Sequence, residues 1–177
     1  MNQGASKYRL FFALWPEPQI QEEMAQVLRR FPRISGRSVP RQNYHVTLAF
    51  LGDVEEERLS CLCEQAAMIE FTPFSLELDR LGAFRRSGIL WLGCSSIPRP
   101  VVQLYQNLSQ ALVPCGYQAE TRPFQPHITL YRRYHARLPV VELKPIVWTI
   151  HDFRLIVSEP EASGVRYQSI ATFPRSA

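Results

Sequence analysis

The chain has 177 residues, of which 46% are hydrophobic, and a formal net charge of +4 with an isoelectric point near 9.0. This composition is that of an ordinary globular protein, and the length allows a substantial core in one domain or two fused lobes. The mildly basic surface suits a polyanionic partner without requiring one. The apolar run from Leu10 to Trp15 is too short for a signal peptide, and no stretch reaches membrane-spanning length. We therefore expect a cytoplasmic protein with no membrane partner.

The first half of the chain predicts strands and helices in alternation. Residues 8–14 are rich in Phe and Leu and predict a buried strand, and apolar side chains recur at helical spacing over residues 18–31. A strand is expected over residues 44–51, ended by Gly52-Asp53, and then a helix over about residues 55–69. An alternating strand begins at Phe74.

The second half repeats this order. We expect a basic loop at 81–87, a strand at 88–93, a helix at 100–113 and a loop at 115–125. Apolar patches at 146–150, 153–157 and 165–173 predict further antiparallel strands. With no linker long enough to separate domains, these elements indicate an α+β protein, residues 1–177 forming one domain of two intertwined lobes.

One short phrase occurs twice, as His45-Val46-Thr47-Leu48 and as His127-Ile128-Thr129-Leu130. In a β-strand, side chains alternate between the two faces, so each copy would present its His and Thr on one face and its apolar pair on the other. A single buried copy would more often be a structural histidine. Two copies, each after a helix and a loop, favour a shared site in a cleft between the lobes.

Paired histidines suit the chemistry of phosphodiesters. With ordinary pKa values of about 6.5, one can act as general base towards an attacking water and the other as general acid towards the leaving oxygen. Thr47 and Thr129, each two residues beyond a histidine, could bind the non-bridging phosphate oxygens. His135 and His151 have no such partner, and we interpret them as surface or strand-end residues.

No cofactor and no metal are predicted. The sequence contains none of the metal-binding or nucleotide-binding motifs that would indicate a metal or a nucleotide cofactor. Of its cysteines, Cys61 and Cys63 are two apart on a predicted helix, while Cys94 and Cys115 stand alone. We expect all of them to be reduced and structural.

The paired motifs resemble the signature of the two-histidine phosphoesterases. Their context, with Arg9-Leu-Phe-Phe-Ala13 early and Arg122-Pro-Phe-Gln-Pro before the second motif, resembles the bacterial RNA 2′,3′-cyclic phosphodiesterases, also called 2′-5′ RNA ligases. The resemblance implies a bilobal fold with pseudo-two-fold symmetry, two mostly antiparallel sheets flanking a central cleft, and helices outside. It also implies metal-independent opening of an RNA 2′,3′-cyclic phosphate to a 2′-phosphate, with 2′-5′ ligation as the reverse use of the chemistry.

The resemblance also implies roles for individual residues. His45 is expected to be the proton donor, His127 the base, and Thr47 and Thr129 the phosphate ligands. Phe50 and Arg132 match positions used for stacking a base and holding the substrate. Strict alternation puts these two on the face opposite the histidines, so a β-bulge or strand end would be needed to bring them round.

Three functional hypotheses remain open at this point. The first is an RNA-end phosphodiesterase that acts as a monomer, without an obligate protein partner, on cyclic RNA ends such as those of tRNA fragments. The second keeps the enzyme class but takes small cyclic phosphates or 2′-5′ oligonucleotides, because the motif reads the phosphate and not the rest of the molecule. The third is a non-catalytic RNA-binding module.

The RNA hypotheses have candidate contacts outside the motifs. Arg85-Arg86, Arg122 and Arg132-Arg133 could form a basic rim, with Trp15, Phe84 or Phe124 as stacking surfaces. The alternatives are a solvated face for the arginines and ordinary packing for the aromatic rings.

Overall fold

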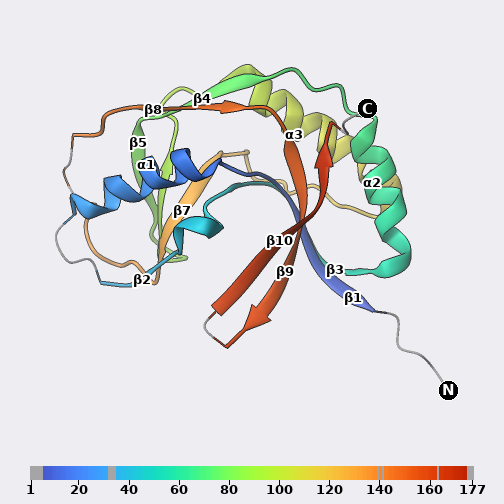
Figure 1. Ribbon diagram of the computed structural model, residues 1–177, viewed down its shortest axis with the longest axis horizontal. Coiled ribbons are helices and arrows are strands. Elements are labelled where there is room, and N and C mark those ends of the chain that lie inside the picture. The colour runs from blue at the N-terminus through green and yellow to red at the C-terminus, as the bar shows by residue number, and fades with distance from the viewer. Residues whose placement is uncertain (1–5, 32–34, 139, 141, 163, 175–177) are drawn as a thin grey trace.

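A computed structural model describes residues 6–31, 35–138, 140, 142–162 and 164–174 (Figure 1). Its strands are β1 (Lys7–Leu14), β2 (Arg37–Ser38), β3 (Val46–Glu55), β4 (Phe74–Leu78), β5 (Arg80–Phe84), β6 (Ile89–Gly93), β7 (His127–Arg132), β8 (Ile146–Ile150), β9 (Phe153–Glu161) and β10 (Gly164–Phe173). Its α-helices are α1 (Pro18–Arg29), α2 (Leu59–Ala67) and α3 (Arg99–Ala111), and short 3₁₀ turns are η1 (Arg41–Asn43), η2 (Glu56–Arg58) and η3 (Val113–Cys115).

The strands form two antiparallel sheets. The larger one has the order β10-β9-β1-β3-β7-β6-β5, with β2 paired to β7, and the smaller one is the pair β4-β8. Each pairing in the described part of the chain is antiparallel, so the predicted α+β class with antiparallel sheets is confirmed. The short connections between neighbours such as β5 and β6 are those that antiparallel pairing allows.

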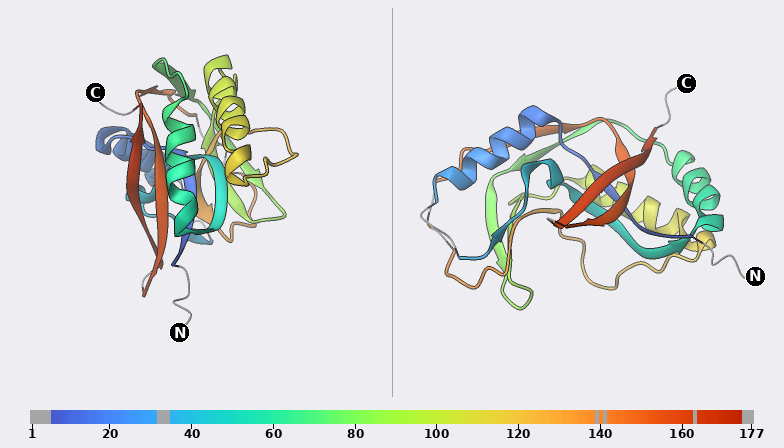
Figure 2. Two further views of the ribbon diagram at one scale, coloured as in Figure 1. Left: turned by 90° about the vertical axis from the view of Figure 1, so that its right-hand side faces the viewer. Right: turned by 60° about the horizontal axis from the view of Figure 1, so that its bottom comes forward.

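The two halves of the larger sheet meet where β3 lies beside β7. The contact is one residue pair, Val46 with Ile128. On either side of it the order strand, helix, His-x-Thr strand is repeated, first as β1-α1-β3 and then as β6-α3-β7. The halves are interlocked, because α3 packs against β3 while α1 contacts β8, and the final hairpin β9-β10 returns to pair with β1. Figures 1 and 2 show the helices on the outside of this arrangement.

Most of the predicted elements are observed, and two of the differences lie in strands near the site. β3 does not end at Gly52-Asp53 but continues to Glu55, because Gly52 adopts the positive φ of 70° that an irregular strand requires there. The expected basic loop at 81–87 is instead β5 followed by a tight turn into β6. Gly82 conceals this strand in the sequence, since glycine is rare inside strands, but here it leaves room for Trp91: a Cβ would lie 2.0 Å from the indole.

The expectation for the cysteines is wrong in part. Cys61 of α2 and Cys115 of η3 form a disulfide, whereas Cys63 and Cys94 are free. The two bonded residues are 54 positions apart and come together only because α2 packs beside η3. Spacing along the chain carries no information about such a contact.

The core lies between the larger sheet and the helices. Buried side chains of β1, β3 and β7, such as Phe12, Leu48 and Ile128, form a continuous cluster with those of α1, α2 and α3. None of the helices in the described ranges is both long and apolar enough to cross a lipid bilayer. Because one face of β3 and β7 is committed to this core, their opposite face is left for polar side chains.

Candidate active site

The two His-x-Thr motifs lie side by side at the centre of the larger sheet. Val46 and Ile128 pair with each other and are buried in the core, 1% and 0% exposed. One residue further in each direction, antiparallel register sets His45 opposite Thr129 and Thr47 opposite His127. Facing residues in such a pair have Cβ atoms about 4.5–5.5 Å apart. The sheet therefore presents both histidines and both threonines on one face, related by a local two-fold axis through the Val46–Ile128 pair.

Both histidines are oriented by the same hydrogen bond. The Nδ1–H of His45 donates to the carbonyl oxygen of Asn43, and that of His127 donates to the carbonyl of Gln125, each at 2.7 Å. Because a carbonyl only accepts hydrogen bonds, Nδ1 must carry the proton in each ring. Nε2 is consequently the atom that each imidazole offers for proton transfer.

The ring of His45 lies in an aromatic box formed by Phe11, Trp15 and Tyr167. Trp15 stacks on it with the planes 1° apart and the centroids 5.3 Å apart, while Phe11 and Tyr167 lie at 5.0 and 5.3 Å. Asn43 adds a polar contact to this side, donating from its amide to the carbonyl of Val165 at 3.0 Å. Trp15, which the sequence offered as a base-stacking surface, is thus occupied on one face by the histidine.

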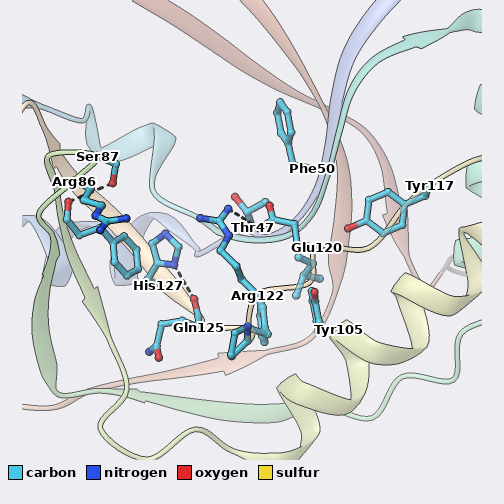
Figure 3. A pocket seen from close by; sticks show the side chains of 14 residues that line it. Thr47, Phe50, Arg86, Ser87, Tyr105, Tyr117, Glu120, Arg122, Gln125 and His127 are labelled. Atoms are coloured by element: carbon cyan, nitrogen blue, oxygen red, sulfur yellow. Dashed lines mark hydrogen bonds and ion pairs between the residues drawn. The ribbon is translucent and has the colours of Figure 1, made fainter.

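His127 has a more open environment. Phe84 meets its ring edge-on at 4.9 Å, and Trp91 lies at 6.3 Å. The remaining side of the ring faces a pocket of about 430 Å³, within the range typical of small-molecule sites. Figure 3 shows His127 and Thr47 directed into this pocket from β7 and β3.

The surroundings of the two histidines lower the pKa of each imidazole. Burial lowers the pKa of His45 to about 4, against the hydrogen bond to Asn43, and the charges of Arg132 and His127 lower it further. Burial also lowers the pKa of His127, again opposed by its backbone hydrogen bond. Loss of water disfavours the charged imidazolium in both cases. At neutral pH, in the absence of an anion, both rings are neutral.

Matching bulges bring Phe50 and Arg132 to the histidine face. Opposite β1, the register of β3 skips Leu48; opposite β6, that of β7 skips Leu130. Each skipped residue is the third after its histidine, and each extra residue shifts the later side chains to the other face. Phe50 then lines the pocket with Thr47, and Arg132 lies close enough to His45 to influence its pKa. Of the two alternatives expected from the sequence, a β-bulge or a strand end, the bulge is present in both strands.

The loop before β7 supplies much of the remaining pocket wall. Phe124 lines the pocket and stacks on Tyr105 of α3, with centroids 4.2 Å apart, so one face of its ring is taken up by packing. Arg122 donates to the carboxylate of Glu120 at 2.7 Å. Tyr105, Tyr117 and Glu120 line the pocket but were not predicted as site residues, because nothing in their local sequence marks them. The carbonyls of Asn43 and Gln125 did carry a signal, since both stand two residues before a motif histidine.

The remaining candidates for metal ligation are the His, Cys, Asp and Glu side chains. Within the described ranges, no group of three or more His, Cys, Asp or Glu side chains is arranged to hold a metal ion. His135 and His151 are exposed and lie outside the pocket, as expected for surface positions.

Comparison with known proteins gives a consistent family assignment. Residues 14–91 match the family model described as LigT-like phosphoesterase. The chain is 40% identical over 125 residues to the RNA 2′,3′-cyclic phosphodiesterase of Escherichia coli (strain K12), covering 70% of this chain and 71% of that protein. The chain belongs to the LigT-like phosphoesterase family.

Further relatives extend this membership over nearly the whole chain. The RNA 2′,3′-cyclic phosphodiesterase of Archaeoglobus fulgidus is 27% identical, with 93% of this chain and 99% of that protein covered. The crystal structure of E. coli LigT complexed with 3′-AMP superposes with a TM-score of 0.83 at 33% identity, covering 95% of this chain and 98% of the other. The resemblance inferred from the sequence is confirmed, and so is the predicted enzyme class, since these family members are named as RNA phosphodiesterases.

Proposed function

We propose that the protein opens 2′,3′-cyclic phosphate ends of RNA to 2′-phosphates, using His45 and His127 as an acid–base pair. The observation that supports this most strongly is the local two-fold arrangement of His45, Thr47, His127 and Thr129 on one face of β3 and β7. It offers two Nε2 atoms on opposite sides of a position where two hydroxyl groups can meet a phosphate.

In the proposed reaction, His127 Nε2 takes a proton from a water molecule as its oxygen bonds to phosphorus. The bond from phosphorus to the 3′ oxygen breaks, and the imidazolium form of His45 gives its Nε2 proton to that oxygen. One water is consumed, and the phosphate remains on the 2′ oxygen. Thr47 and Thr129 donate hydrogen bonds to the non-bridging oxygens, whose charge grows in the transition state.

Phe50 and Arg132 have supporting roles in this proposal. Phe50 lines the pocket, and the guanidinium of Arg9 lies 5.1 Å from its ring centroid. The side chain is still 48% exposed, so part of its aromatic surface is free to stack on a nucleobase. Arg132 contributes positive charge near His45, suited to holding the anionic substrate. With a 5′-hydroxyl in place of water, the same groups would form a 2′-5′ bond.

The proposal also covers the oligomeric state of the enzyme, its location and its RNA substrate. We infer that the enzyme acts as a monomer in the cytoplasm on RNA ends, including those of tRNA fragments. The basic isoelectric point near 9.0 is consistent with a polyanionic substrate.

The histidine assignment is tested with single substitutions. We expect His45→Ala and His127→Ala each to lower kcat by about 10² to 10⁴ on a cyclic-ended oligoribonucleotide in EDTA, because each removes one proton-transfer step. His151→Ala, an exposed histidine away from the pocket, is the matched control and should retain activity. Circular dichroism checks that all three variants fold. Wild-type rates in both motif variants would rule out the two-histidine mechanism.

A further inference from the structure

One end of the larger sheet carries an accumulation of arginines, of which the proposed reaction uses only Arg132. Arg85 and Arg86 lie in the turn between β5 and β6, and Arg132, Arg133 and Arg137 lie at and beyond the end of β7; we call these five the basic track. All five are exposed. They belong to two segments distant in sequence, so their proximity is a product of the fold.

The two segments are joined directly. The backbone N–H of Tyr134 donates to the carbonyl of Gly88 at 2.9 Å, and a Cβ on Gly88 would lie 3.3 Å from the Cα of Arg133. Burial raises the pKa of Tyr134 while the nearby charge of Arg85 opposes that rise, which places Arg85 beside the second segment. In the right-hand view of Figure 2, the green β5-β6 turn and the orange chain after β7 lie at the same end of the molecule.

The charges of the basic track have no compensating carboxylates in the part of the chain that the structure describes; the same holds for single exposed arginines such as Arg30, Arg80 and Arg99, so it is the clustering of five such residues that distinguishes the track. Lys7, Arg9, Arg29, Arg41, Arg122 and Arg154 each form an ion pair with an Asp or Glu. None of the five track arginines has such a carboxylate partner within the described residues. Clustered like charges repel one another, and a bound polyanion offsets that repulsion. The arginines in turn replace counterions condensed on the polyanion, which are released.

The backbone at Arg133 adds a second observation. Its φ is 56°, and it is the one non-glycine residue of the described chain with a positive φ. A side chain in this left-handed conformation costs about 1–2 kcal/mol, so glycine would be the favoured residue on structural grounds alone. Strained positions of this kind gather at functional surfaces.

The basic track begins at the active-site pocket. Arg86 and Ser87 line the pocket together with His127, and Figure 3 shows Arg86 and Ser87 beside the histidine. From there the track leads to Arg85 and on to Arg133 and Arg137. A nucleotide at the 3′ end of RNA has a neighbour only on its 5′ side, so the rest of the strand must leave the pocket along one route.

We propose that the basic track binds the phosphodiester backbone of the RNA strand that precedes the cyclic end. This inference rests on the proposed function, which puts the cyclic phosphate between the two histidines, and it deepens it by naming a single-stranded RNA chain as the preferred substrate over a cyclic mononucleotide. Arginine is suited to this contact because its planar guanidinium pairs with phosphate oxygens in a bidentate manner.

The test compares two substrates with the same terminal nucleoside, a 2′,3′-cyclic mononucleotide and a short oligoribonucleotide with a cyclic end. The track variant is Arg85→Gln/Arg133→Gln/Arg137→Gln, which leaves in place Arg86 at the pocket and Arg132 near His45. The matched control, Arg30→Gln/Arg80→Gln/Arg99→Gln, removes the same charge from exposed positions on α1, β5 and α3 or at their ends. The corresponding Arg→Lys track variant retains the charge.

We expect the track variant to lose about tenfold more kcat/KM on the oligoribonucleotide than on the mononucleotide, and the slope of log kcat/KM against log salt to fall by about 2 for the three lost contacts. The control variant should keep the wild-type ratio, and the Lys variant should keep most of it. Equal losses on both substrates, the same loss in the control variant, or no loss would each overturn the proposal.

A failure of the proposed function is distinguishable from a failure of the basic track. If the wild-type protein turns over neither substrate, the proposed function is wrong. Fluorescence anisotropy with the same oligoribonucleotide ending in a 3′-hydroxyl then tests whether the basic track binds RNA. About tenfold weaker binding by the track variant than by the control variant then supports it, and equal binding overturns it.

Discussion

At the scale of single residues, the two histidines share one orienting bond but differ in how they are covered. His45 is enclosed by three aromatic rings, whereas His127 opens on the pocket. A pKa of about 4 leaves His45 neutral at pH 7, yet a proton donor must be an imidazolium. An anionic phosphate beside the ring favours the charged form and raises the pKa. The acid is therefore expected to gain its proton as the substrate binds.

This proton uptake can be observed directly. We predict that a bound nucleoside 2′-monophosphate raises the pKa of His45 by more than one pH unit, because the phosphate contributes negative charge within a few ångströms of a partly buried ring. NMR titration of the imidazole signals measures it, and exposed His151 serves as an internal reference. An unchanged His45 titration with saturating ligand would contradict the assigned role.

The aromatic box accounts for the low pKa in the free protein. Trp15→Ala removes the ring stacked on His45 and admits water, so we predict that the pKa of His45 rises towards its ordinary value near 6.5. The linked effect on stability follows. The buried neutral His45 stabilises the native state above pH 6.5, and this contribution is lost as the pH falls from 6.5 towards 4. The variant should show a shallower loss of unfolding free energy over that range.

Phe84→Ala is the matched comparison for Trp15→Ala. It uncovers His127 instead, so the pKa that rises should be that of His127 while His45 keeps its low value. If Trp15→Ala left the titration of His45 unchanged, the aromatic box would pack against His45 without affecting its pKa.

At the scale of elements, the strands around the site depend on close contacts that sequence patterns describe poorly. Gly82 of β5 faces Trp91 of β6, and the same indole lies beside His127. We predict that Gly82→Ala destabilises the protein by about 1–3 kcal/mol, since the Cβ cannot fit without displacing the indole. Denaturant unfolding measures this. Ala83→Gly at the neighbouring position is the comparison and should cost less, about 1 kcal/mol, as it only loosens the strand.

The disulfide links α2 to the start of the loop that forms a pocket wall. Closing a segment of 54 residues is expected to stabilise the fold by about 4 kcal/mol in the chain-entropy view. We therefore predict that Cys61→Ser/Cys115→Ser lowers the unfolding free energy by about 2–4 kcal/mol. Cys63→Ser, two residues away and free, should change it by much less. Equal stabilities for the two variants would mean that the bond does not constrain the unfolded chain.

The sequence made part of this organisation predictable, and the reasons for the rest are physical. The repeated His-x-Thr phrase, read with strand alternation, specifies four side chains on one face. The mismatch at Phe50 and Arg132 called for a β-bulge or a strand end, and the structure has bulges, at Leu48 and Leu130. Tyr167 could not be assigned to His45 beforehand, because β10 reaches β3 only through β9 and β1. Phe11 and Trp15 lie on and just after β1, and their contact with His45 depends on the β1–β3 pairing, which the strand pattern of the sequence does not specify. The disulfide was missed because Cys61 and Cys115 are 54 residues apart and meet only where α2 packs beside η3.

At the scale of the whole molecule, two similar halves meet at one residue pair and are interlocked by exchanged helices and the returning hairpin. We expect residues 1–177 to unfold as a single unit, because α3 covers β3 and β9 pairs with β1. Calorimetry tests this: the van't Hoff and calorimetric enthalpies should agree. A second resolved transition would show that the lobes are separately stable.

The proposed reaction as a whole is cleavage of the bond to the 3′ oxygen of a cyclic RNA phosphate by the paired histidines at the β3-β7 junction, without help from a metal. The most direct measurement is product analysis after incubating the protein in EDTA with an oligoribonucleotide that ends in a 2′,3′-cyclic phosphate. We predict a 2′-phosphate as the product, with wild-type turnover undiminished by the chelator. A 3′-phosphate product, or activity that disappears with EDTA and returns with added metal, would contradict it.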